Sequence, residues 1–173
     1  MAPVVLPDME DIMWLAFLDE IRTTDQNGEE IDMITCFLIP GEPKGKARPR
    51  VNTATHRAYT PEDTKQYERT VQYSYLNAYP AGQRFHIGPC NVTITACFPV
   101  PVSWPRWKKY KALSGEIAPE KKPDADNIAK AVLDALNGIA YRDDSQVVNL
   151  MVSKRYAERG HVTVRIESKE AVQ

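Results

Sequence analysis

Two pairs of aspartates flank one apolar segment of the 173-residue chain. Asp124 and Asp126 precede the segment, and Asp143 and Asp144 follow it. Two carboxylates one residue apart in an extended segment project to the same side and repel each other unless a cation lies between them. If the chain turns back after the segment, one of the later aspartates can join the first pair. Three carboxylates would form the all-oxygen ligand set that Mg²⁺ or Mn²⁺ prefers.

The apolar segment itself has the pattern of a mostly buried helix over residues 127–137. At about 100° per residue, its polar side chains fall within an arc of about 80°. These polar residues are Asn127, Lys130, Asp134 and Asn137. Gly138 is a natural helix end. Lys130 lies one turn into the helix, where its ammonium could meet a phosphate oxygen. Together, the three carboxylates and this lysine indicate phosphoryl-transfer chemistry.

Each of these features is also consistent with a purely structural role. Asp126 could cap the helix, Lys130 and Asp134 could form an i,i+4 ion pair, and the later aspartates could form a turn. Such a role does not account for Asp124. From the residues alone, the metal-binding and the purely structural interpretations both stay open.

A second group of charges lies upstream, in "EPKGKARPRVN" at residues 42–52. Four cations alternate strictly there, so an extended chain would present all of them on one face. They are Lys44, Lys46, Arg48 and Arg50. Pro43 and Pro49 favour the extended form. The spacing of roughly 6–7 Å per residue pair is comparable with that of successive phosphates, which predicts binding to a nucleic-acid backbone. A charged edge strand guarded against aggregation is the alternative.

A smaller group combines lysines with tryptophans and has two interpretations. Its members are Trp104, Trp107, Lys108, Lys109 and Lys111. Such a group can bind nucleic acid through cations and stacked bases. It can equally be a hydrophobic anchor for a loop.

The remaining sequence predicts an α+β fold, in which a few helices cover one small sheet. Alternation and β-branched composition predict strands, with the last two joined as a hairpin around Gly160. The strands are expected at 33–40, 90–100, 146–157 and 161–168, and helices at 61–79, 127–137 and within 99–116. The helix over 61–79 should have Thr60 as N-cap and Pro61 in its first position. Its apolar stripe, which is either core or a dimer interface, comprises Tyr67, Val71, Tyr75 and Ala78.

Composition sets the broad class of protein. The net charge of −1 neither favours nor excludes a polyanionic partner, so any such surface must come from local clustering. The three cysteines suggest neither a disulfide framework nor a zinc site. No apolar run approaches the roughly 20 residues that cross a bilayer. We therefore expect a cytoplasmic protein without a membrane partner, with residues 1–30 as an appendage and 31–173 as the functional domain.

The central segment "KKPDADNIAKAVLDALNG", followed by "YRDDSQVV", resembles the signature of the RusA-type Holliday-junction resolvases. The upstream "GEPKGKARPRV" and "YTPEDTKQYE" resemble that family's N-terminal features. The resemblance implies a small, homodimeric α+β endonuclease of bacteria, phages or prophages that nicks four-way DNA junctions symmetrically with Mg²⁺, for which Mn²⁺ can substitute. Asp124, Asp126 and Asp144 match its metal-binding and catalytic acids. Lys130 matches its functional lysine, whereas Asp143 has no assigned role.

The predicted function is therefore structure-specific DNA cleavage in recombination, repair or phage DNA processing. In this prediction the basic segment from Lys44 to Arg50 holds the DNA backbone. Two alternatives are a branched-DNA-binding protein without cleavage and a metal-dependent phosphohydrolase that is not a nuclease. Activity on a branched duplex, compared with activity on small phosphate esters, distinguishes among the three.

Overall fold

A four-stranded mixed sheet forms the centre of the protein. The computed structural model describes residues 32–47, 50–51, 58–59, 61–80 and 85–169, so the proposed N-terminal appendage lies outside the described residues. The strand order is β1-β6-β4-β5. Strand β6 is antiparallel to both β1 and β4, and β5 is parallel to β4. The four strands are β1 (Asp32–Pro40), β4 (Cys90–Pro99), β5 (Val147–Ala157) and β6 (His161–Lys169).

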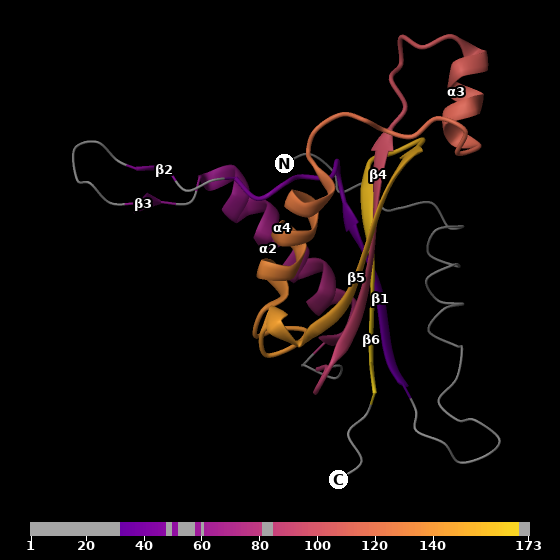
Figure 1. Ribbon diagram of the computed structural model, residues 1–173. Coiled ribbons are helices and arrows are strands. Elements are labelled where there is room, and N and C mark those ends of the chain that lie inside the picture. The colour runs from indigo at the N-terminus through magenta and orange to yellow at the C-terminus, as the bar shows by residue number, and fades with distance from the viewer. Residues whose placement is uncertain (1–31, 48–49, 52–57, 60, 81–84, 170–173) are drawn as a thin grey trace, which may run out of the picture.

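Two helices cover one face of this sheet, and a third projects from its end (Figure 1). The covering helices are α2 (Glu62–Ala78) and α4 (Ala125–Leu136). Helix α3 (Arg106–Leu113) follows the end of β4. A 3₁₀ turn, η2 (Asp144–Gln146), follows α4, and the short strands β2 (Arg50–Val51) and β3 (Ala58–Tyr59) pair with each other. The predicted α+β class is confirmed.

The hydrophobic core lies between the sheet and its two covering helices. Strand β4 turns alternate side chains toward the helices, and Val92, Ile94 and Phe98 are buried there. Helix α4 contributes most of its surface to this core, as its apolar pattern predicts. Each fully buried aliphatic or aromatic side chain contributes about 1.5–3 kcal/mol of hydrophobic free energy. Helix α4 is therefore held rigidly against the sheet, which fixes the residues at both of its ends.

The apolar stripe of α2 belongs to the core. Tyr67, Val71 and Tyr75 are buried, whereas Ala78 is exposed and Tyr79 is buried in its place. The helix begins at Glu62, one residue later than expected, because Pro61 is the extended N-cap residue. The predicted cap, Thr60, lies outside the described residues.

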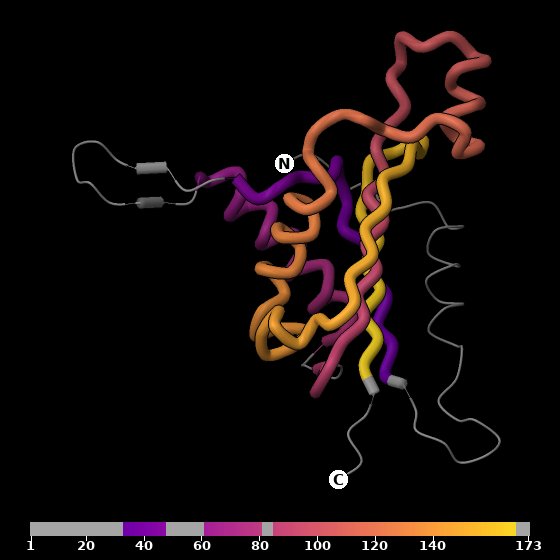
Figure 2. Tube along the Cα trace, viewed as in Figure 1, coloured from indigo at the N-terminus to yellow at the C-terminus, as the bar shows by residue number. Residues whose placement is uncertain are grey.

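The predicted hairpin between the last two strands is wrong. Strand β4 lies between β5 and β6, and residues 158–160 cross its end, as the Cα trace allows the reader to follow (Figure 2). The backbone N–H of Val100, just after β4, donates to the carbonyl of Ala157 at 3.1 Å. In this interior position the helix-facing residues of β4 are buried along its whole length, whereas several β5 residues are exposed at the sheet edge.

None of the helices in the described part of the chain is both long enough and apolar enough to cross a bilayer.

Candidate active site

A short extended segment lies across the beginning of α4. We call this segment, residues 43–47, the basic strap. The backbone N–H of Lys46 donates to the carbonyl oxygen of Asn127 at 3.0 Å, which joins the strap to the first turn of the helix. A Cβ atom added to Gly45 would lie 2.9 Å from Cβ of Pro123 and 3.1 Å from Cβ of Asn127. Only glycine allows so close an approach without displacing the strap or the helix.

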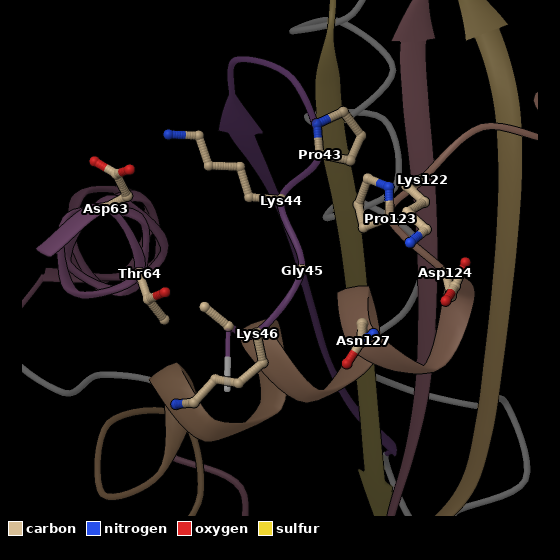
Figure 3. A pocket seen from close by; sticks show the side chains of 11 residues that line it. Pro43, Lys44, Gly45, Lys46, Asp63, Thr64, Lys122, Pro123, Asp124 and Asn127 are labelled. Atoms are coloured by element: carbon tan, nitrogen blue, oxygen red, sulfur yellow. The ribbon is translucent and has the colours of Figure 1, made fainter. Parts of the chain in front are cut away.

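The strap forms one wall of a cavity of about 470 Å³ (Figure 3). The start of α2 forms a second wall, and the turn that enters α4 forms a third. Charged side chains from all three walls line it: Lys44, Lys46, Asp63, Lys122 and Asp124. Figure 3 shows Lys44 reaching toward the start of α2, with Asp124 on the opposite side of the cavity. Two of these lysines, Lys44 and Lys122, are exposed, which suits an anionic ligand such as a phosphodiester.

Asp124 is the N-cap residue of α4, but its carboxylate does not cap the helix. Its backbone has extended dihedral angles, φ −71° and ψ 154°, and its carbonyl oxygen accepts from the N–H of Ile128 at 3.0 Å. The side chain makes no capping hydrogen bond. A carboxylate at the positive end of a helix dipole that forms no cap is available to bind a ligand.

Asp126 lies inside the first turn of α4 rather than before it. The expectation that Asp124 and Asp126 project to the same side of one extended segment is therefore wrong, because the helix begins between them at Ala125. The two carboxylates instead flank the same helix end. Lys130 follows Asp126 by one turn on the exposed side of α4.

The later aspartates divide into a capping residue and a half-buried acid. Asp143 Oδ1 accepts from the N–H of Ser145 at 3.0 Å, and Gln146 Oε1 accepts from the N–H of Asp143 in return. The bonds from Ser145 lower the pKa of Asp143. Asp144 makes no such cap and is half-buried. The two residues differ because Asp143 is the N-cap of the 3₁₀ turn and Asp144 is its first residue.

Asp144 lies near the far end of α4. Burial first, and then the charge of Asp144, raises the pKa of Tyr141, whose hydroxyl donates to the carbonyl of Leu133 at 3.0 Å. The 12 residues of α4 span about 18 Å. Asp124 and Asp126 are at one end of this length, and Asp144 is beside the other. Accordingly, in the described ranges, no three acidic, histidine or cysteine side chains are gathered to hold a metal ion.

Lys46, a predicted DNA contact, joins the two covering helices. Its ammonium contacts Glu68 of α2 and lies 3.0 Å from Asp134 of α4, and all three side chains are partly buried, with exposed fractions of 22–26%. Burial works to lower the pKa of Lys46, but the two carboxylates outweigh burial and the net pKa is raised. No sequence pattern pointed to Glu68, because this contact joins separate elements. Asp134 binds this lysine, although sequence spacing suggested a pair with Lys130.

The other predicted DNA contacts have different surroundings. Lys44 is exposed on the strap. Arg48 lies outside the described residues, and of Arg50 only the backbone in β2 is described. Lys122 was not predicted, although it lies two residues before Asp124 in the sequence and lines the cavity with it.

We expect Lys46→Met to lower the free energy of unfolding by about 1–3 kcal/mol, because two partly buried carboxylates then lose their shared hydrogen-bond donor. Urea unfolding followed by circular dichroism measures the change. Lys44→Met is the matched control, because it removes an exposed cation two residues away and should change stability by less than about 0.5 kcal/mol. Equal stability of the two variants would show that the bridge contributes nothing.

Comparison with known proteins identifies the family that the sequence matches. The family model described as Endodeoxyribonuclease RusA matches residues 40–167. The chain is also 37% identical, over 139 residues, to the uncharacterized protein YqaN of Bacillus subtilis (strain 168). That similarity covers 78% of this chain and 96% of YqaN. The family match includes the strap, both ends of α4 and all four aspartates.

Proposed function

The chain belongs to the RusA endodeoxyribonuclease family, and from this premise we propose that it resolves four-way (Holliday) DNA junctions by paired, symmetric nicks. The observation that carries the proposal is the carboxylate of Asp124, which makes no capping bond and lines a cavity rich in lysines. Recombination, repair and phage or prophage DNA processing, in the cytoplasm, are the settings that supply such junctions.

The acids at the start of α4 suit a hard divalent cation. Asp124 and Asp126 offer carboxylate oxygens, the ligands that Mg²⁺ and Mn²⁺ prefer. A metal ion bound there would activate water and neutralise charge on the phosphodiester. Lys130, one turn beyond Asp126, stabilises negative charge at the scissile phosphate in this proposal. Asp124, Asp126, Lys130 and Asp144 are thus the proposed catalytic residues.

The strap holds the DNA backbone next to these acids. Lys44 and Lys122 line the cavity and can bind phosphates on either side of the scissile one. Arg48 and Arg50 continue the proposed contact along the strand. Lys46 supports it by fixing the strap to both helices, since its ammonium already has two carboxylate partners.

A homodimer explains why Asp144 lies apart from the other two acids. Helix α4 keeps them at opposite ends, and its burial prevents the ends from approaching. In a two-fold dimer, Asp124 and Asp126 of one chain can meet Asp144 of the partner subunit. Such a dimer contains two equivalent sites, which match the two equivalent strands to be cut in a junction.

A gel assay with purified protein tests this function. We expect a four-way junction to be nicked in two opposed strands with Mg²⁺ or Mn²⁺, and to remain intact with a chelator. A linear duplex of the same sequence should be cut at least about tenfold more slowly, because it cannot present two strands to both sites at once. Junction binding without cleavage would identify a binding protein, and hydrolysis of small phosphate esters without junction cleavage would identify a phosphohydrolase.

A further inference from the structure

The two tryptophans near α3 have different surroundings. The ring of Trp104 packs edge-on against Tyr156, with centroids 5.3 Å apart, and the ammonium of Lys108 lies 3.9 Å from its centroid. Trp104 is thus the anchor that fixes this loop to β5. Trp107 has an exposed fraction of 63%, and Tyr110, three residues later, of 72%. Because Trp104 already anchors the loop, anchoring does not account for the exposed pair Trp107 and Tyr110.

Trp107 and Tyr110 lie together on the outward side of α3. Residues three apart are neighbours on a helix surface, about 5–6 Å apart at Cβ. The buried residue of the helix, Ala112, lies on the opposite side. Arg106 and Lys111 are exposed on either side of the aromatic pair in the helical projection. Two large, rigid aromatic rings are therefore flanked by cations on one face of the helix.

This end of the sheet is also positively charged around the helix. Four of the eight residues of α3 are basic and none is acidic. Lys121 and Lys154 lie 5.0 Å and 5.4 Å from the ring centroid of Phe98. The acids that approach these cations form exposed pairs, Lys111 with Glu116 at 3.4 Å and Lys121 with Glu42 at 3.7 Å. Exposed pairs are weak and can be exchanged for phosphates.

We propose that the Trp107–Tyr110 face of α3 is a platform on which unpaired DNA bases stack. Aromatic side chains among cations are the combination that binds single-stranded nucleic acid, because bases stack on the rings while phosphates pair with the charges. The inference rests on the proposed function, since base stacking is interrupted at the branch point of an open four-way junction, where an aromatic ring can cover the uncovered base faces. Residues 114–123 join α3 directly to Asp124, so bases held on α3 would be positioned relative to the cleaved strand (Figure 1).

Binding of a fluorescent oligothymidine, without metal, tests the platform. The double variant Trp107→Ala with Tyr110→Ala should bind it at least about tenfold more weakly than the wild type, because stacking on both rings is lost. Trp107→Phe with Tyr110→Phe should retain most of the affinity, since aromatic faces remain. Tyr73→Ala is the matched control, because Tyr73 is an equally exposed tyrosine, at 72%, on α2. That control should bind as the wild type does.

The outcomes separate a base-stacking platform from a dimer interface and from the cleavage activity. Unchanged oligothymidine affinity in the double alanine variant would overturn the platform. Conversion of a dimer to a monomer by the same variant would also overturn it, by assigning the face to a second copy of the chain. Failure of the wild-type protein to cleave junctions would overturn the proposed function alone, because oligothymidine binding requires neither metal nor a branch.

Discussion

Asp124→Asn, Asp126→Asn and Asp144→Asn should each reduce junction cleavage by on the order of a thousandfold while junction binding is retained or tightened. Asparagine preserves the shape of each side chain but removes the charge that holds a divalent cation. It also removes repulsion between a carboxylate and the DNA phosphates, so affinity for the junction should not fall. Single-turnover cleavage and an electrophoretic binding assay measure the two properties separately.

Asp143→Asn is the matched control for this experiment. The carboxylate of Asp143 caps the 3₁₀ turn by accepting from Ser145, and asparagine caps about as well as aspartate. Cleavage by this variant should therefore stay near the wild-type rate. Full activity in any of the other three variants would remove that residue from the site. If Asp143→Asn reduced cleavage as much as Asp144→Asn, the assignment of Asp143 to capping and of Asp144 to catalysis would be wrong.

Mixing two inactive variants should restore cleavage if the acids meet across a dimer. In a heterodimer of an Asp124→Asn chain and an Asp144→Asn chain, one site carries both substitutions and the other carries neither. Random pairing of equal amounts makes half of the dimers heterodimers, so about a quarter of all sites should be intact. Co-expressed, differently tagged chains, purified through both tags, isolate the heterodimer. It should nick one strand of a junction rather than two.

The control for this mixture combines Asp124→Asn with Asp126→Asn. Both substitutions lie at the same end of α4, so every site in such a heterodimer contains one of them and no activity should return. Recovery in the first mixture but not in the second would support a shared site. A stable heterodimer of the first kind without any cleavage would mean that each chain contains its whole site.

The local features of this protein could be predicted from its sequence. Alternation and β-branched composition identified the four long strands, and a helical apolar pattern ending at Gly138 identified α4. These features depend on contacts between residues close in the chain. There the spacing of apolar residues and the residues that cap each helix decide the conformation. The cluster of aspartates around α4, and the resemblance of this segment to a family signature, could also be read from the sequence, because the motif is continuous along the chain.

Only the tertiary structure decided how these elements combine. Strand order depends on which strand can be buried most completely, so β4 separates two strands that are adjacent in sequence. Packing between helices gave Lys46 its partners Glu68 and Asp134, and packing against β5 anchored Trp104 while leaving Trp107 exposed. The rigid length of α4 then separates Asp124 from Asp144, a distance that no local pattern encodes because it follows from burial of the helix against the sheet.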